Sequence, residues 1–460
     1  MTHASSTTLP TDAARDTFDL VVIGAGMAGL AAARKVASKG RRVAIVDSRP
    51  YGGTCALRGC DPKKVLIGLA DLVDAQERLR DHGLRGASAI DWAQAMAFKR
   101  TFTEPLPAKL EAGLVRAGVT PLHGEASFVA PDRLRVGRDT IRSEAFLIAT
   151  GATPRPLSLP GAEHLATSSD FLELDALPNR IVFVGGGFVS FEFAHLAARA
   201  GAHVTVVDRH ARPLTAFDPD LVDRLVDESR ARGIDVRSER SVTAVDARRN
   251  GCTVHLDDGA TIDADLVVHG AGRVPDLEGL DLDAAEVPFD PARGVQVNDR
   301  LQSVGNPAVY AAGDAAATDG PPLTPVAVHE GLIAAANLLG GEPRRPDYRG
   351  TPSVVFTGPP LARAGLGEEE ARAAGMDLDV RSGDMSRWFT ARRTREPVAA
   401  YKVLIDRQSD RIVGAHLLAG HAAETIDLFA LAIRHGLTRR DLKTSVLVHP
   451  AAASDVVYMI

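Results

Sequence analysis

FDLVVIGAGMAGLAAAR, residues 18–34, joins an apolar run, a glycine-rich turn and an alanine-rich segment. The turn contains Gly24, Gly26 and Gly29 in the spacing G-x-G-x-x-G, and a second apolar run, RVAIVD, ends at Asp47. In such a unit the first glycine permits a tight turn, the second lets the backbone approach a pyrophosphate, and the third lets helix pack on strand. The helix N-terminus faces the phosphates, and the acid would hold a ribose hydroxyl. A glycine triad alone also fits a structural turn, but the complete unit favours dinucleotide binding.

The same pattern occurs a second time in RIVFVGGGFVSFEFA, residues 180–194. Gly185 and Gly187 match the first two glycines, Ser190 takes the third position, and HVTVVD ends at Asp208. The spacing from first glycine to acid is the same in both units. Two such units predict two bound dinucleotides, a flavin and a nicotinamide coenzyme.

The residues after the second acid bear on the choice of nicotinamide coenzyme. Asp208 suits the ribose of NADH, but Arg209, His210 and Arg212 follow it. An arginine at this place can accommodate the 2′-phosphate of NADPH. The alternative is a group of solvated surface charges. The pattern favours NADPH over NADH.

Two of the chain's 3 cysteines, Cys55 and Cys60, lie in YGGTCALRGCDPKK, residues 51–64. A metal site needs more ligands than this pair, and a structural disulfide is unusual in a cytosolic protein. A helix that begins after Thr54 would lower the pKa of the thiols and favour the reactive thiolate. Five residues of regular helix rise ~7.5 Å, too far for a disulfide, so the turn must be distorted, as Gly59 permits. We interpret the pair as redox-active.

Composition narrows the class of protein. The chain has 460 residues, a net charge of -6 and 45% hydrophobic residues, which favour a multi-domain globular protein without a nucleic-acid-binding field. No apolar run reaches the ~18 residues of a membrane span. Residues 1–17 lack the features of a signal peptide and are expected to form a flexible leader. We therefore expect a cytoplasmic protein with neither a membrane nor a nucleic-acid partner.

With these motifs the chain resembles the class I pyridine nucleotide-disulfide oxidoreductases, the family of glutathione reductase, dihydrolipoamide dehydrogenase and mercuric reductase. GGTCALRGCDPKK matches that family's redox-disulfide motif. The resemblance implies that Cys55 is the interchange thiol and that Cys60 lies nearer the flavin of a bound FAD. It also places Lys63 on the N5 side of the flavin, paired with Glu192 from the nicotinamide domain.

Other stretches support the resemblance. LIATGATP, residues 147–154, resembles the exit from the flavin domain, and GAGRVPD, residues 270–276, the return to it. VYAAGD ends at Asp314, which the resemblance assigns to the ribityl chain, and LTPVA, residues 323–327, resembles the stretch under the isoalloxazine. Beyond the residues of the two glycine units, the predicted cofactor-binding set comprises Gly53, Thr54, Lys64, Thr150, Gly151, Phe188, Gly272, Gly313 and Asp314.

The chain closes with SVLVHPAAASDVVYMI. The resemblance implies that His449 crosses a homodimer interface and serves as acid–base group for the partner's cysteines. The family's ending is His-Pro-Thr-x-x-Glu, but here Ser454 takes the glutamate position and Asp455 follows. Either Asp455 takes over the role or His449 is held more weakly. Phe188 stands where glutathione reductase has a tyrosine over the nicotinamide pocket.

The predicted fold class is α/β, with two Rossmann-like dinucleotide-binding domains and a C-terminal α+β dimerisation domain. Residues 18–152 and 278–345 would bind FAD, residues 153–277 would bind NADPH or NADH, and residues 346–460 would form the interface domain.

The substrate is expected to be a small-molecule disulfide. Arg34 sits where glutathione reductase binds a glutathione carboxylate, but Leu110 and Leu332 replace two other substrate contacts. The alternatives are a dihydrolipoamide dehydrogenase-like enzyme and an NAD(P)H oxidoreductase for quinones or metal ions. A non-catalytic flavoprotein is a further class, which NAD(P)H-driven bleaching of the flavin would exclude.

Overall fold

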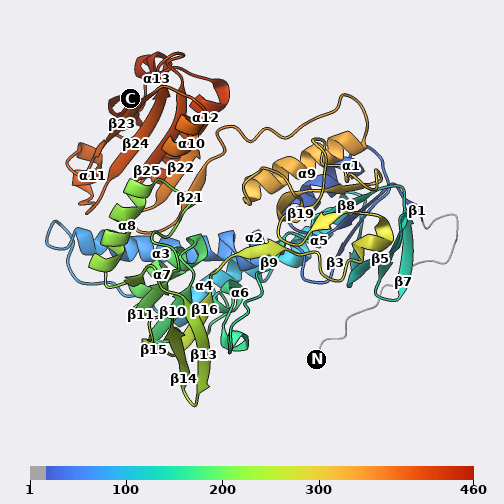
Figure 1. Cartoon of the computed structure of the whole chain (residues 1–460), viewed down its shortest axis with the longest axis horizontal. Coiled ribbons are helices and arrows are strands. Elements are labelled where there is room, and N and C mark those ends of the chain that lie inside the picture. The colour runs from blue at the N-terminus through green and yellow to red at the C-terminus, as the bar shows by residue number, and fades with distance from the viewer. Residues whose placement is uncertain (1–16) are drawn as a thin grey trace. The chain divides into compact units, whose positions relative to one another are not determined.

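The computed structural model describes residues 17–460, coloured along the chain in Figure 1. The predicted flexible leader therefore lies outside the described residues, except for Thr17. The chain divides into two compact units. Of the described residues, the first contains 17–57, 104–153 and 274–347, and the second contains 58–103, 154–273 and 348–460. The division into three domains stays a prediction, because the second unit combines the nicotinamide and interface segments and also includes residues 58–103.

The first unit is built on a parallel sheet of order β20-β8-β2-β3-β4 that carries the first glycine unit. Its glycine turn links β2 to α1, and α1 packs against α9. A second sheet has the order β1-β7-β6-β5. The main elements are β1 Thr17–Phe18, β2 Leu20–Ile23, α1 Met27–Ala37, β3 Val43–Asp47, α5 Leu106–Arg116, β4 Val119–His123, β5 Ala126–Ala130, β6 Arg133–Val136, β7 Asp139–Ser143, β8 Phe146–Ile148, β18 Phe289–Asp290, β19 Gly294–Val295, β20 Val309–Ala311 and α9 Thr324–Leu338.

The second unit contains the second glycine unit in a parallel sheet of order β12-β11-β10-β16. A three-stranded antiparallel sheet, β13-β14-β15, lies between β12 and β16 in the chain. The elements are α3 Cys60–Arg78, α4 Trp92–Thr103, α6 Ser168–Phe171, β10 Arg180–Val184, α7 Phe188–Arg199, β11 His203–Val207, α8 Pro219–Ala231, β12 Asp235–Arg237, β13 Val242–Arg248, β14 Gly251–Leu256, β15 Thr261–Ala264 and β16 Leu266–His269. Two short strands, β9 Ala152–Pro154 and β17 Arg273–Pro275, pair with each other.

The C-terminal part of the second unit is an antiparallel sheet of order β21-β22-β25-β24-β23 with helices beside it. The strands expected at residues 401–406 and 412–418 are confirmed, and the following helix ends at Gly436, whose φ is +63°. The elements are β21 Ser353–Val355, β22 Leu361–Gly365, α10 Glu368–Ala373, β23 Leu378–Asp384, α11 Phe389–Arg393, β24 Ala400–Asp406, β25 Ile412–Leu418, α12 Ala422–His435, α13 Arg439–Thr444 and α14 Ala452–Met459.

Both glycine turns have the backbone geometry that the motif requires. Gly24 has a φ of +104°, and a Cβ on it would lie 2.3 Å from the carbonyl oxygen of Ala149. Gly185 has a φ of +99°, and a Cβ on it would lie 2.7 Å from Cα of Ala271. A side chain at either position would combine strain with a backbone clash. The two predicted strand–turn–helix units are therefore confirmed as structure.

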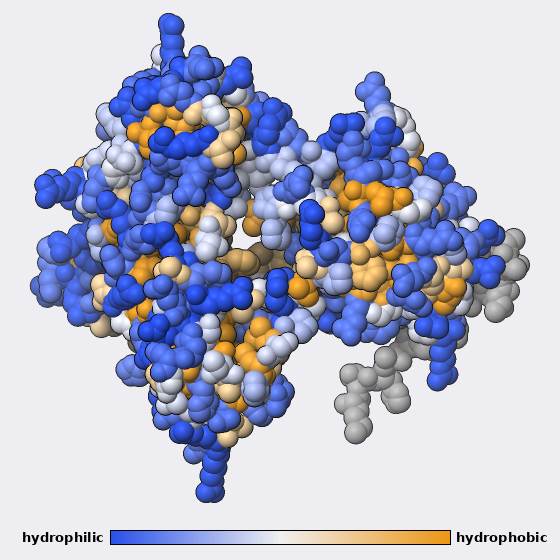
Figure 2. Space-filling view, in the orientation of Figure 1, coloured by the Kyte–Doolittle hydropathy of each residue, from blue (hydrophilic) through white to orange (hydrophobic). Residues whose placement is uncertain are grey.

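One hydrophobic core runs through the second unit. It joins Phe183 of β10 and Phe191 of α7 to Val355 and Leu418 of the C-terminal sheet, and all four are buried. Helix α7 is thereby packed against residues of β10 and of the C-terminal sheet. Figure 2 shows apolar patches between hydrophilic residues on the visible face. Among the described residues, no helix combines the length and apolar character of a membrane span.

Candidate active site

Helix α2, Gly53–Arg58, carries Cys55 and begins against the first glycine turn. Gly53 has a φ of +65°, and a Cβ on it would lie 2.6 Å from Cα of Gly26. This contact is backbone against backbone, so only glycine permits it. The segment that carries Cys55 is therefore built directly onto the predicted pyrophosphate-binding turn.

Tyr51, two residues before α2, anchors this segment to Leu122 of β4. Its side chain is fully buried, and its hydroxyl lies 2.7 Å from the carbonyl oxygen of Leu122 while it accepts the N–H of the same residue at 2.9 Å. Burial raises the pKa of Tyr51, so the hydroxyl stays a neutral donor. Tyr51 was not among the predicted site residues, because a tyrosine before a glycine pair carries no distinctive signal.

Cys60 is the first residue of the 19-residue helix α3, and Gly59 is its N-cap. The break between α2 and α3 at Gly59 is the distortion that the motif required, with φ -150° and ψ -109°. The helix dipole favours negative charge at its N-terminus, which suits a thiolate.

Lys63, in the first turn of α3, pairs with Glu192 of α7. The Lys63 Nζ lies 2.5 Å from Oε2 of Glu192, and both side chains are almost fully buried. The other carboxylate oxygen, Oε1, accepts the backbone N–H of Phe356 at 2.9 Å. The structure thus brings together two predicted residues and adds a third that the sequence analysis missed.

His195, one turn beyond Glu192, is buried and neutral. Its Nδ1 accepts the N–H of Gly358 at 3.2 Å, and Nε2 lies 2.9 Å from Oγ of Ser229, whose hydroxyl donates to Leu225. Nε2 therefore carries the proton. Burial holds the pKa of His195 well below its ordinary value, helped by the positive charges of Arg199 and Arg232.

The far ends of α3 and α7 are joined by a second buried ionic cluster. Asp74 of α3 pairs with Arg199 at the end of α7, and Nη1 of Arg232 lies 2.7 Å from the same Asp74 oxygen. Ion pairs near both ends of α3 therefore fix the helix that Cys60 begins.

The acids of the two glycine units differ in their surroundings. Asp47 accepts the N–H of Ala25 at 2.8 Å, within the first glycine turn. Asp208 is buried beneath Gly186, where a Cβ would lie 2.4 Å from its Oδ2, and its Oδ1 is 3.1 Å from Nδ1 of His210.

The basic residues after Asp208 separate into two groups. Arg209 and His210 are exposed beside the acid. Arg212 binds both carboxylate oxygens of Asp223 on α8, at 2.6 and 2.8 Å. Arg209 thus stays available for a phosphate, whereas His210 contacts Asp208 through Nδ1 and Arg212 is committed to Asp223 of α8.

Within residues 17–460, a buried hydroxyl without a partner lies beside the first glycine turn, as suits a site for a dinucleotide. In the first unit, the buried Thr150 Oγ1 has no hydrogen-bond partner among the described residues, and it lies beside the turn at Gly24. Gly313 donates its N–H to the buried carboxylate of Glu330 at 2.7 Å, which fixes the loop before Asp314. Glu330 is a further residue that the sequence analysis missed.

The remaining predicted cofactor residues lie in these same segments. Gly187 is the N-cap of α7, and Phe188, which begins that helix, is 48% exposed. Gly151 accepts the N–H of Asp276, and Gly272 that of Arg155, at the exit and return segments.

His449 and Asp455, which lie near each other in the sequence, do not contact each other through a hydrogen bond or ion pair within the described chain. Asp455 accepts a hydrogen bond from the hydroxyl of Thr390 on α11. His449 is exposed. The structure thus assigns a local partner to Asp455.

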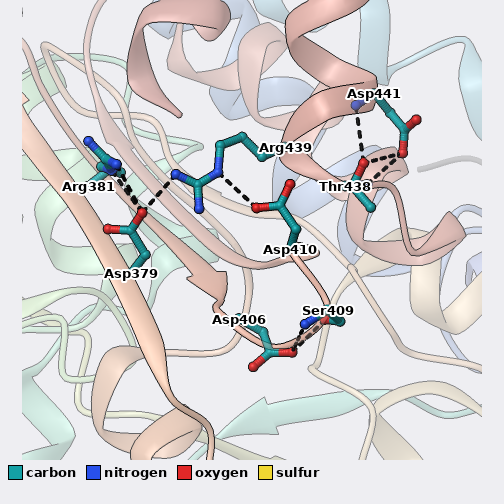
Figure 3. Close-up of polar contacts among 8 residues, drawn as sticks. All are labelled: Asp379, Arg381, Asp406, Ser409, Asp410, Thr438, Arg439 and Asp441. Atoms are coloured by element: carbon teal, nitrogen blue, oxygen red, sulfur yellow. Dashed lines mark hydrogen bonds and ion pairs between the residues drawn. The ribbon is translucent and has the colours of Figure 1, made fainter.

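The segment before His449 starts from a firmly held helix, α13. Arg439 bridges Asp379 of β23 and Asp410 of the β24–β25 turn, at 2.8 and 3.0 Å (Figure 3). Thr438 and Asp441 form a capping box at the helix start, and the hydrogen bonds from Thr438 lower the pKa of Asp441. After α13 the chain exposes apolar residues that suit a protein interface, among them Val446, Val448 and Tyr458.

An open cavity of about 530 Å³ lies between α8 and the end of β12, lined by Arg230, Arg237 and Arg240 among others. These arginines already bind protein oxygens of Val236, Asp235 and Asp258. No group of three or more His, Cys, Asp or Glu residues in the described part of the chain is arranged to hold a metal ion.

Comparisons with known proteins agree with this geometry. The profile described as pyridine nucleotide-disulphide oxidoreductase matches residues 18–331, and the dimerisation domain of the same name matches residues 351–460. A glutathione reductase of Burkholderia cepacia is 34% identical, covering 96% of this chain and 98% of its own. A mercuric reductase of Staphylococcus aureus is 31% identical, covering 93% of this chain and 79% of its own.

Among solved structures, the HOCl-induced flavoprotein disulfide reductase RclA from Escherichia coli superposes with a TM-score of 0.87 at 27% identity, covering 96% of this chain and 99% of its own. A Cu(II) complex of the same protein superposes with a TM-score of 0.86 at 27% identity, covering 95% of this chain and 98% of its own.

Proposed function

The chain belongs to the pyridine nucleotide-disulphide oxidoreductase family, and from that premise we propose that it reduces a low-molecular-weight disulfide at Cys55 and Cys60. It is an FAD-dependent NAD(P)H disulfide oxidoreductase with a dimerisation domain. The observation that carries the proposal is the backbone contact of Gly53 with Gly26, which supports the cysteine segment on the predicted FAD-binding turn.

Bound FAD supplies a two-electron relay between NAD(P)H and the cysteine pair. In the reduced enzyme, the Cys55 thiolate attacks one sulfur of the substrate disulfide and releases the first product thiolate. Cys60 then attacks the mixed disulfide at Cys55, which releases the second thiolate and restores the Cys55–Cys60 disulfide. Both leaving thiolates need a proton, which the homodimer partner's His449 would deliver.

The residues around the cysteines hold the reacting groups in place. Lys63 and Glu192 form a fixed buried pair one turn along α3 from Cys60. Gly24, Gly26, Gly29 and Asp47 would hold FAD, while Gly185, Gly187 and Asp208 would hold the nicotinamide coenzyme. Arg209 supports NADPH. A cysteine pair that must cycle also suits the cytoplasm, our proposed location.

An anaerobic titration tests this function. Two electrons from NADPH or NADH should bleach the yellow colour and produce a long-wavelength thiolate–flavin absorption. Glutathione disulfide, cystine and oxidised lipoamide, added in turn, should reveal the acceptor by restoring the oxidised spectrum. The proposal fails if coenzyme leaves the flavin oxidised, or if no small disulfide reoxidises the reduced enzyme.

A second candidate is reduction of a quinone or a metal ion. It is favoured by the hydrogen bond of Asp455 to Thr390, which leaves His449 without that carboxylate. Electron transfer to such acceptors does not require an oriented thiol base.

A further inference from the structure

Phe356 lies where the C-terminal region meets α7. It directly follows β21, its N–H donates to Oε1 of Glu192 at 2.9 Å, and Gly358 donates to Nδ1 of His195 at 3.2 Å. Glu192 and His195 are one helical turn apart, so the segment is fixed along α7 at two points. Phe356 itself is half-buried and cannot shift without breaking these contacts.

The ring of Phe356 contacts the ammonium groups of two lysines on α3. The Lys64 Nζ lies 3.9 Å from the ring centroid, and the Lys63 Nζ lies 5.0 Å from it. Both distances are within the ~6 Å range of a cation–π interaction. Consecutive helical side chains point in different directions, so the ring, rather than helix geometry, brings both lysines to one place.

We propose that Phe356 is a positioning residue for the Lys63–Glu192 pair. Its N–H orients the carboxylate, and its ring holds the ammonium groups and shields one side of the pair from water. The inference rests on the proposed function, in which Lys63 acts beside the flavin. Phe356 belongs to the dimerisation domain at residues 351–460, so that domain controls the orientation of a lysine on the redox helix.

Three variants distinguish the effect of the aromatic ring of Phe356 from the effect of its side-chain volume. Phe356→Leu keeps the backbone N–H and most of the apolar volume but removes the π face, whereas Phe356→Tyr and Phe356→Trp keep it. Phe98→Leu is the matched control, because Phe98 is 50% exposed on α4 and contacts the ring of Phe102. Size-exclusion chromatography and thermal unfolding establish that each purified holoenzyme is folded.

The direct readout is NMR of protein produced with carbon-13-labelled lysine, observed at the ε-methylene groups of Lys63 and Lys64. In the wild type, the Lys63 and Lys64 resonances should be shifted upfield by the ring. The shift should vanish in Phe356→Leu and persist in Phe356→Tyr, Phe356→Trp and Phe98→Leu. Unshifted wild-type resonances, or shifted resonances in Phe356→Leu, would overturn the proposal.

The second readout is the stopped-flow rate of flavin reduction by NADPH. Loss of the cation–π contacts should slow Phe356→Leu about threefold to tenfold, with near wild-type rates in the aromatic variants and the control. Equal rates in Phe356→Leu and wild type would overturn the positioning role. A wild type whose flavin is not reduced would instead overturn the proposed function, while the NMR result would still decide the position of Phe356.

Discussion

Lys63 and Glu192, 129 positions apart in the chain, form a buried ion pair with Nζ 2.5 Å from Oε2. Only 11% of the lysine and 3% of the glutamate side chain is exposed. Both charges have lost most of their water, so each depends on the other for compensation. The pair also joins the helix that Cys60 begins to the helix that the second glycine turn begins.

Breaking this pair should destabilise the protein strongly. Glu192→Gln leaves the Lys63 charge buried without a counter-charge, and we expect the free energy of unfolding to fall by about 3–5 kcal/mol. Urea unfolding at pH 7, followed by circular dichroism, measures the change. The double variant Lys63→Met/Glu192→Met should recover most of the loss, because no charge remains. A cost below about 1 kcal/mol for Glu192→Gln would contradict the buried geometry.

His195 should make stability depend on pH. Its pKa is depressed in the folded state, so the unfolded state binds more protons below the ordinary value of about 6.5. The contribution of His195 to the free energy of unfolding is complete above that pH. It should fall as the pH decreases, by at most ~1.4 kcal/mol per pH unit. Urea unfolding between pH 5 and 8 measures it. His195→Gln should flatten the slope, whereas His82→Gln, an exposed control, should not; identical slopes in all three proteins would refute the role of His195.

Cys55→Ser separates the two candidate functions. The variant should lose all disulfide reduction, because the attacking sulfur is gone, yet keep NAD(P)H-driven reduction of a dye or quinone. Cys252→Ser is the control, since Cys252 lies in β14 and its burial raises its pKa, which keeps it a thiol. Steady-state assays with both acceptor classes give the result. If the wild type reduced only the quinone, the second candidate would replace the first.

His449 and Asp455 should differ in their effects. His449→Gln should lower disulfide turnover by about 10²–10⁴ and leave flavin reduction by NADPH unchanged, because the base acts on thiols. Asp455→Asn keeps an acceptor for Thr390 and should change turnover little. The pH profile of kcat, with Thr390→Val as a further control, distinguishes the cases. A loss in Asp455→Asn as large as in His449→Gln would show that Asp455 has taken the glutamate's role.

Arg209 should select the coenzyme. Arg209→Ala removes an exposed cation beside Asp208, and we expect KM for NADPH to rise about tenfold to a hundredfold with KM for NADH little changed. Arg248→Ala is the matched control, because Arg248 lies on β13 and pairs with Asp263. Steady-state kinetics with both coenzymes measure the ratio. An equal rise for NADH would exclude contact with a 2′-phosphate.

Local patterns in the sequence were sufficient for much of the fold. Gly24 and Gly185 need positive φ within a few residues of a strand and a helix, and the spacing of the motif records that need directly. The stop of α12 at Gly436 and the helix break at Gly59 are likewise local, since each depends on one residue's backbone freedom. The family resemblance then supplied the pairing of Lys63 with Glu192.

The tertiary structure alone decided which side chains surround that pair. Phe356 and Gly358 reach Glu192 and His195 from more than 160 positions away, through contacts that no local spacing encodes. Asp455 was ambiguous in the sequence because its neighbours in the chain do not reveal Thr390, which reaches it from α11. The sequence determines where a backbone must turn, since that depends on a few adjacent residues. Partners of buried polar groups are chosen by the packing of whole elements, because a buried donor or charge accepts whichever complementary group the fold brings within reach.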